Sequence, residues 1–282
     1  MDFDRYRVED LPPLAPGDEG KPYAEYYYRG RAEVTDPELL DAIRPDHPMD
    51  VSEALYPHQL IDLVQPGAKP PRIGYCLLPE GVAYCCARLK LDRVNTEMRH
   101  WYMEWVYGDP RLRYQIWYPG AHGVHYRNLV MEDFGNGMTW LFQGERPSLK
   151  ELGFDREPRE YDPQVIKIVG RNARACPVGE DINQPRGYSS LIHLTRKLAG
   201  GGVELWSVGW TGAHIIGGKM KVMLAPGEVV TQEAGRQMCS HLIYEYATQN
   251  QLLPELYARF GQAPLEPEVP WPEEIAQNLT LR

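Results

Sequence analysis

The sequence has few of the features that mark secreted, membrane-bound or nucleic-acid-binding proteins. Its 282 residues include only five cysteines, without the spacing of a zinc finger, and we interpret them as reduced core thiols. The net charge is −9 and no run of Lys or Arg is present, so neither nucleic acid nor a membrane surface is an expected partner. No stretch has the length of a membrane span or the character of a signal peptide. We therefore expect a soluble, cytoplasmic protein that binds small molecules.

The first 70 residues differ in composition from the rest of the chain. They are rich in Pro, Tyr and charged residues, and prolines interrupt regular structure. Short helices are predicted at 37–43 and 51–64. We interpret residues 1–70 as an N-terminal arm packed on a main domain formed by residues 71–282.

The main domain reads as a succession of strands with two helices. Glycine-rich turns at 135–137 and 200–202 indicate hairpins, and helices are expected at 97–107 and 228–260. This order predicts an α+β fold in which a curved antiparallel sheet grips the long C-terminal helix and leaves a ligand cavity between them. The expected strands are 81–91, 112–118, 124–132, 138–143, 165–170, 188–198, 203–210 and 213–224.

The long C-terminal helix carries the first candidate for a metal site. His241 and Glu245 lie one turn apart on one helical face, beside the apolar stripe that includes Leu242 and Tyr246. A carboxylate in such a place needs a partner. The same spacing recurs at His58 and at His100, so the motif by itself is weak evidence.

Three features in order resemble the family of 2,4-diacetylphloroglucinol hydrolase and phloretin hydrolase. They are the aromatic helix before Gly108-Asp109-Pro110, the segment LRYQIWYPGAH at 112–122, and the late His-x-x-x-Glu. The resemblance spans most of residues 71–260. It implies a helix-grip fold similar to Bet v 1, a bound zinc ion, a homodimer, and hydrolysis of the carbon–carbon bond between an acyl group and a phenolic ring.

The resemblance also implies a set of metal ligands. By order and spacing, the family's His, Glu, His and Glu fall on His100, Glu132, His241 and Glu245. Two imidazoles and two carboxylates suit zinc, and manganese or iron would also accept them. The aromatic helix is altered around His100, so His122 and His125 are alternatives for the early histidine. Glu132 could equally be a solvated strand end.

The expected chemistry needs a proton donor in addition to zinc-activated water. His193 is the candidate general acid because the resembling family has a catalytic histidine at about this place; the alternatives are a structural role for His193, or His214 as the acid. Candidate contacts for the phenolic ring are Tyr102, Tyr188, Trp210, His214 and Tyr246. The expected substrate is a phenolic ketone. Two other functions stay open: a non-catalytic helix-grip carrier of a hydrophobic small molecule, and another metal-assisted reaction such as ester hydrolysis.

Overall fold

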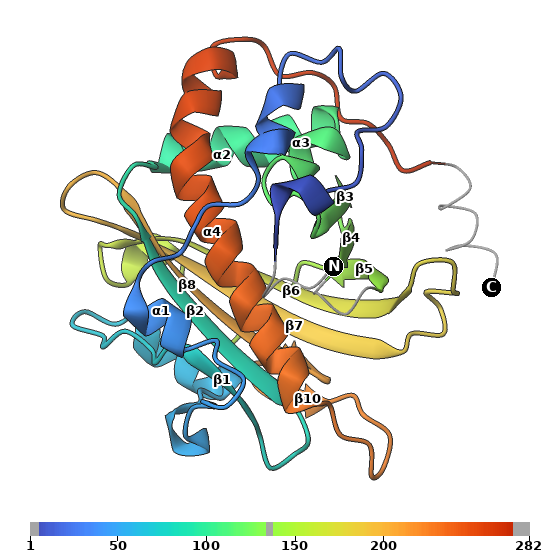
Figure 1. Ribbon diagram of the computed structural model, residues 1–282. Coiled ribbons are helices and arrows are strands. Elements are labelled where there is room, and N and C mark those ends of the chain that lie inside the picture. The colour runs from blue at the N-terminus through green and yellow to red at the C-terminus, as the bar shows by residue number, and fades with distance from the viewer. Residues whose placement is uncertain (1–5, 134–137, 273–282) are drawn as a thin grey trace.

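An eight-stranded antiparallel sheet forms the centre of the protein. The computed structural model describes residues 6–133 and 138–272 (Figure 1). The strand order is β1-β2-β8-β7-β6-β5-β4-β3, and the expected α+β class is confirmed. Its strands are β1 (Gly74–Leu77), β2 (Ala83–Leu91), β3 (His122–Tyr126), β4 (Leu129–Asp133), β5 (Thr139–Glu145), β6 (Val165–Pro177), β7 (Gly187–Lys197) and β8 (Val203–Thr211).

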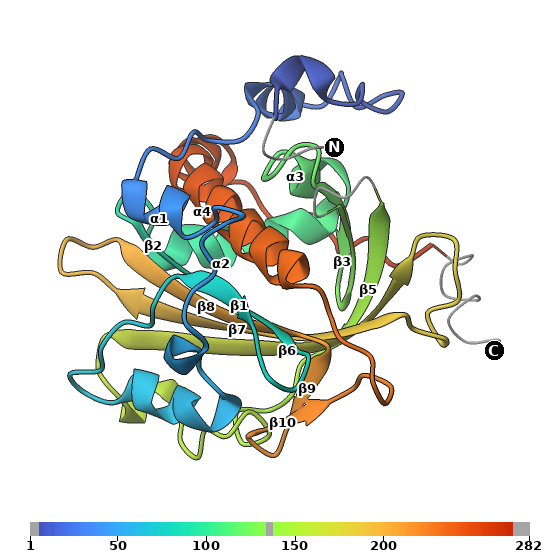
Figure 2. The same cartoon turned by 60° about the horizontal axis from the view of Figure 1, so that its bottom comes forward.

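The long C-terminal helix α4 (Gln232–Phe260) lies across one face of this sheet (Figure 2). Thr231 caps its first turn by accepting a hydrogen bond from the Ala234 amide at 3.3 Å. The helix begins later than 228 because the preceding segment is extended, with the Val230 amide donating to the Gly81 carbonyl at 2.8 Å. Gly235 allows close approach to β2, since a Cβ atom there would lie 2.8 Å from the Tyr84 carbonyl oxygen.

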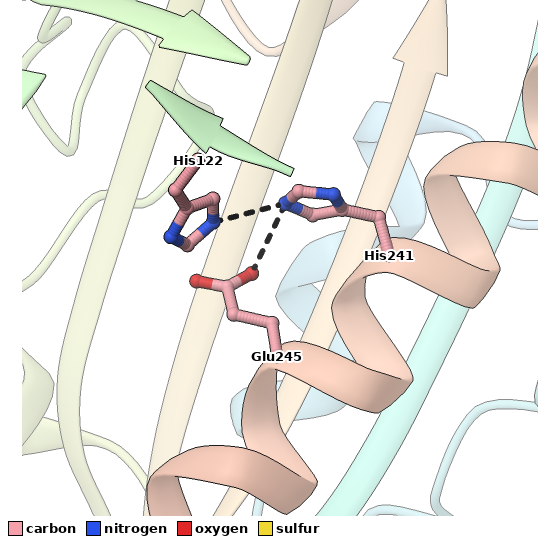
Figure 3. A group of neighbouring side chains, drawn as sticks. All are labelled: His122, His241 and Glu245. Carbon is pink, nitrogen blue, oxygen red and sulfur yellow. Dashed lines mark hydrogen bonds and ion pairs between the residues drawn. The ribbon is translucent and has the colours of Figure 1, made fainter. Parts of the chain in front are cut away.

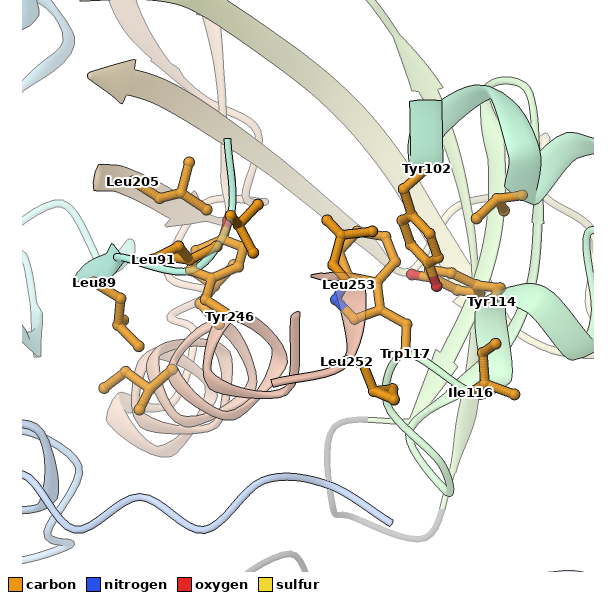
Figure 4. Close-up of a cluster of buried hydrophobic side chains, with 14 of the residues drawn as sticks. Leu89, Leu91, Tyr102, Tyr114, Ile116, Trp117, Leu205, Tyr246, Leu252 and Leu253 are labelled. Atoms are coloured by element: carbon orange, nitrogen blue, oxygen red, sulfur yellow. The ribbon is translucent and has the colours of Figure 1, made fainter. Parts of the chain in front are cut away.

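The apolar core lies on both faces of the sheet. One cluster fills the space beneath α4 with leucines of the sheet and with Tyr246 of the helix (Figure 4). A second cluster on the opposite face contains Trp206, Val208 and Trp210 of β8. Side chains alternate between faces along a strand, so Leu205 and Ser207 face α4 while these three residues face away.

Two predicted strands before residue 133 have a different structure. Residues 112–118 begin with the short helix α3 (Leu112–Gln115), whose first amide donates to Asp109 Oδ1 at 3.3 Å. Residues 124–132 form most of the β3–β4 hairpin instead of one strand, because Asn128 takes a left-handed conformation with φ of 65°. The predicted Gly135-Asn136-Gly137 turn lies outside the described residues, although β4 and β5 pair as an antiparallel ladder.

The predicted strand 213–224 is a second small hairpin. It consists of β9 (Ala213–Ile216) and β10 (Lys219–Val222), which form a separate two-stranded sheet. Gly217 and Gly218 both have positive φ angles, which permit the tight turn between the strands.

The remaining helices are short, apart from α2 (Thr96–Trp105), whose first turn is capped by Asn95. Residues 51–64 form two 3₁₀ helices rather than one α-helix. Within the described residues, no helix is both long and apolar enough to cross a membrane. The short helices are η2 (Val8–Asp10), η3 (Ala24–Arg29), α1 (Pro37–Asp41), η4 (Val51–Glu53), η5 (Pro57–Val64), η6 (Val106–Gly108) and η7 (Pro158–Glu160).

The N-terminal segment packs on α4. Tyr26 and Tyr27 belong to the same apolar cluster as the helix, and the Tyr26 hydroxyl donates to Glu255 at 3.1 Å. The Ala32 amide donates to Thr248 Oγ1 at 3.0 Å. The division into an arm of residues 1–70 and a domain of residues 71–282 stays a prediction.

Candidate metal centre

Three buried side chains from two distant parts of the chain converge beside α4. His241 and Glu245 come from the helix, with 3.8 Å between Nε2 and Oε2, and His122 is the first residue of β3. The Nε2 atoms of the two histidines lie 3.3 Å apart (Figure 3). All three residues offer ligand atoms within 4.8 Å of one another, which makes them a candidate metal site.

His122 is held in one orientation by the segment that precedes it. The ring of Tyr114 stacks on the imidazole at a centroid distance of 3.8 Å, with 6° between the planes. His122 Nδ1 lies 3.1 Å from the Tyr114 carbonyl oxygen, to which it can only donate. In the neutral ring this bond places the proton on Nδ1 and leaves the Nε2 lone pair facing His241.

The donor set fits a zinc ion. Burial lowers the pKa of both His122 and His241, which keeps the imidazoles neutral, as metal ligation requires. Tetrahedral zinc with bonds of about 2.0–2.1 Å separates two ligand atoms by roughly 3.3 Å. The observed separations of 3.3 Å and 3.8 Å are close to that value. All three ligand atoms lie within 4.8 Å of one another, so these residues are suitably placed to hold a metal.

Glu132 lies next to this group without being part of it. It is directly opposite His122 in the β3–β4 ladder, and only 7% of its surface is exposed. The Tyr114 hydroxyl donates a short hydrogen bond to its carboxylate. Burial, and then the neighbouring Glu132, raise the pKa of Glu245 well above its usual value. A bound cation would offset the cost of burying two carboxylates together.

A cavity of about 370 Å³ opens beside the group, between α2, α4, β6 and β7. His241, Glu245 and Glu132 line it, and so do His193 and Tyr246. This volume lies in the range of small-molecule sites. The cavity predicted between the sheet and the long helix is therefore present.

His193 lies on the cavity wall in a small polar network. Its Nδ1 atom is 2.8 Å from Ser207 Oγ and 2.8 Å from the Tyr246 hydroxyl, and these two oxygens are 2.8 Å apart. Burial, followed by the charges of Arg99 and Arg171, lowers the pKa of His193 to about 3. The ring is therefore neutral near pH 7, and its Nδ1 edge is already engaged.

The other predicted site residues do not belong to the three-residue group. His100 is exposed on α2 at the cavity wall and is outside the group that includes the alternative, His122. Tyr102 donates to the Arg113 carbonyl at 2.7 Å, and Trp210 lies on the far face of the sheet, where its indole donates to the Leu55 carbonyl at 3.0 Å.

Tyr188 and His214 are also outside the cavity lining. Their rings lie edge to face at 5.4 Å, and His214 Nε2 is 3.1 Å from the Ala173 carbonyl oxygen. Of the predicted ring contacts, only Tyr246 therefore reaches the cavity. Tyr114 and Arg171, which also line it, were missed by the sequence analysis. Tyr114 lies within the segment 112–122, which could have drawn attention to it.

Comparison with known proteins gives two curated relatives, each named 2,4-diacetylphloroglucinol hydrolase. The one from Pseudomonas sp is 26% identical over 271 residues, which cover 86% of this chain and 89% of the relative. The one from Pseudomonas protegens is also 26% identical, with coverage of 86% and 85%.

The likeness to solved structures is weaker. The crystal structure of the Mll3558 protein from Rhizobium loti matches with 11% identity and a TM-score of 0.33, over 60% of this chain and 96% of that chain. This similarity is too low to support an argument about the fold.

The family described as "DAPG hydrolase PhiG domain" matches residues 55–258, well over half of the chain, so the protein belongs to this family, as its sequence features predicted.

Proposed function

We propose that this protein is a zinc-dependent hydrolase that breaks the carbon–carbon bond between an acyl group and a phloroglucinol-type ring. The observation that carries the proposal is the convergence of His122, His241 and Glu245 beside a cavity, in a chain of the DAPG hydrolase family. The names of the two curated relatives support the choice of an acylphloroglucinol as substrate. A metal-assisted hydrolysis needs an open ligand position, and a three-residue group provides one.

In this proposal His122, His241 and Glu245 hold the zinc, and Glu132 is the candidate for a fourth ligand, in which case water would take a fifth position. When bound, zinc would lower the pKa of a water ligand to about 7 and polarise the ketone oxygen of the substrate. Tyr114 supports the site twice, because its carbonyl orients His122 and its hydroxyl holds Glu132. The proposed ligand set does not include His100.

His193 is proposed to move the proton that the reaction requires. Water adds its oxygen to the acyl carbon and its proton to the ring carbon, which yields a carboxylic acid and the free polyphenol. Tyr246 and Ser207 hold the Nδ1 edge of His193, so its Nε2 edge is the one available to the substrate. An imidazole whose pKa is about 3 becomes a strong acid once it receives the water proton, and it can then pass that proton to the ring carbon.

The finer details of the fold and setting are proposals of the same kind. We propose that the sheet and α4 form a variant of the Bet v 1-like helix-grip fold, with a homodimer and a cytoplasmic location as the family resemblance implies. The support is the antiparallel sheet across which α4 lies, with the cavity beside the helix.

The test is a hydrolysis assay coupled to metal analysis. The purified protein is incubated with 2,4-diacetylphloroglucinol or phloretin, and release of acid and phenol is followed by chromatography alongside elemental analysis. We expect stoichiometric zinc, turnover, loss of both after chelation and recovery on adding zinc. His241→Ala should abolish turnover, whereas His58→Ala, which alters the same His-x-x-x-acid spacing at an exposed position of η5, should not. A zinc-loaded protein that cleaves neither compound contradicts the proposal, and a metal-free protein that binds them would instead be a carrier.

A further inference from the structure

The cavity carries more positive charge than the proposed reaction needs. Four cationic side chains line it, namely Arg99, Arg146, Lys167 and Arg171. Three carboxylates also line it, but Glu132 and Glu245 belong to the metal end. The third, Glu104, lies 3.5 Å from Arg127, which is a further cation. Away from the metal, the cavity therefore has an excess of positive charge.

Arg99 of α2 provides the strongest evidence that the positive charge of the cavity binds an anionic ligand. Its Nη1 atom is buried, and within residues 6–133 and 138–272 it has no hydrogen-bond partner. No ion pair involves this side chain in the described structure. Burial of a guanidinium nitrogen without a hydrogen-bond partner costs free energy, and such groups are therefore rare in folded proteins. A carboxylate would satisfy it with a charge-assisted hydrogen bond.

Two of the other cations lie on a regular array on the cavity floor. Lys167, Val169 and Arg171 of β6 share one face of the strand and pair with Thr195, His193 and Leu191 of β7, in that order; all six line the cavity. Lys167 and Arg171 are thus about 13 Å apart along the strand, with His193 opposite the midpoint. A substrate ring beside His193 would have one cation on the metal side and one on the other side.

The position of Arg171 is built into the neighbouring strand. A Cβ atom at Gly144 of β5 would lie 2.5 Å from Arg171 Cδ, so the glycine provides the room in which the arginine stem lies. Arg171 lines the cavity together with Glu132 and His241. This arginine therefore lies in the same cavity as the proposed metal site.

The other three cations, Arg99, Arg146 and Lys167, lie close enough to one another to interact. Burial, followed by the charges of Arg99 and Arg146, lowers the pKa of Lys167. Arg146 donates to the Tyr107 hydroxyl at 3.2 Å, and this neutral partner does not compensate its charge. Cations gathered in this way repel one another, and an anion placed between them would remove the repulsion.

We propose that the natural substrate is an anionic phenolic ketone, whose ring or acyl chain bears a carboxylate held by Arg99, Arg146 and Lys167. This inference rests on the proposed function, and it assigns the substrate class. The separation of two residues along β6 between the His193 position and Lys167 corresponds to about 7 Å, which a short aliphatic chain can span. Neutral acylphloroglucinols would then be poorer substrates than their carboxylated counterparts.

Binding of a compound that cannot be cleaved tests the inference apart from the chemistry. The probe is 4-(2,4,6-trihydroxyphenyl)butanoate, which has the ring and a carboxylate but no ketone, and its methyl ester is the uncharged comparison. By calorimetry with the zinc-loaded protein, we expect the acid to bind about 10 to 100 times more tightly than the ester, the usual worth of a charge-assisted contact.

Substitutions then locate the anion site. Lys167→Met and Arg99→Gln should each reduce the preference for the acid about tenfold and leave the affinity for the ester unchanged. Lys197→Met is the matched control, because Lys197 is an exposed lysine of the adjacent strand β7 that does not line the cavity. Lys167 is only partly buried, with much of its surface exposed, so its substitution should not disturb folding.

The outcomes separate this inference from the proposed function. Equal affinities of the native protein for acid and ester overturn the inference, and so does a preference that survives both cavity substitutions. If the acid is preferred but no acylphenol is hydrolysed, the proposed function fails and the anion site stands. If neutral 2,4-diacetylphloroglucinol is cleaved by a protein that shows no preference for the acid, only the inference fails.

Discussion

Replacement of His122 should remove zinc from the protein, whereas replacement of His100 should not. The two histidines are the alternatives for the early ligand, and the structure places only His122 beside His241 and Glu245. His122 would supply one of three protein bonds to the metal. Loss of a hydrogen-bonding residue behind a ligand already weakens binding about 10- to 100-fold. Loss of a ligand itself should therefore exceed 100-fold.

The substitution at His122 must remove the metal ligand without destabilising the fold. His122→Ala also leaves the Tyr114 carbonyl without its donor, which costs about 1–3 kcal/mol of stability for a buried group. His122→Asn is the better variant, because its amide can still donate to that carbonyl while the Nε2 ligand is gone. His100→Asn is the matched control, since His100 lines the cavity beside the metal group from an exposed position on α2.

Zinc affinity is measured by competition with a chelating dye, together with elemental analysis and thermal unfolding of each variant. We expect His122→Asn to remain folded with an affinity reduced by more than about 100-fold. His100→Asn should bind zinc as the native protein does. The reasoning is refuted if His122→Asn keeps native affinity, or if His100→Asn loses zinc.

Four further expectations follow from the same structure. Glu132→Gln should weaken zinc binding about 10- to 100-fold, the range for a neighbouring group, or more if it is a ligand. His193→Ala should keep zinc and lose about 100- to 10,000-fold in kcat in a steady-state assay. Gly235→Ala should destabilise the fold by about 1–3 kcal/mol in urea unfolding, because the added methyl group would meet the Tyr84 carbonyl. Burial lowers the pKa of His125 from 6.5 to about 3. As the pH drops from about 6.5 towards 3, the unfolded chain therefore binds a proton at this residue before the folded protein does, and the stability of the fold decreases. His125→Gln should lessen this loss by up to about 1.4 kcal/mol per pH unit.

Each of these has an outcome that contradicts it. Native zinc affinity in Glu132→Gln would remove that carboxylate from the site, and near-native kcat in His193→Ala would move the proton transfer to another group. Gln251→Ala, at an exposed position of α4, is the control for Gly235→Ala, and equal stability of the two variants would refute the packing argument. For His125, parallel pH profiles of native and variant protein in the presence of a chelator would show that its burial has no cost.

Much of the fold follows from local sequence patterns. Asn95 and Thr231 are good caps, and the helices after them form within a few residues of their predicted starts. Apolar and β-branched runs located most strands, and the glycines at 200–202 marked a true hairpin between β7 and β8. Errors arose where a turn lies inside such a run. Residues 124–132 look continuous, yet Arg127 and Asn128 reverse the chain there.

The sequence alone supplied the family, the α+β class, the cavity between sheet and helix, and the pair His241 and Glu245. These features depend on order along the chain and on helical spacing, which local patterns record. The tertiary structure alone decided that His122 joins the pair from 119 residues away, and that the hairpin register sets Glu132 opposite it. It also turned Trp210 away from the cavity, because a shift of one residue along a strand reverses the face on which a side chain lies, and the pairing of distant strands fixes that face.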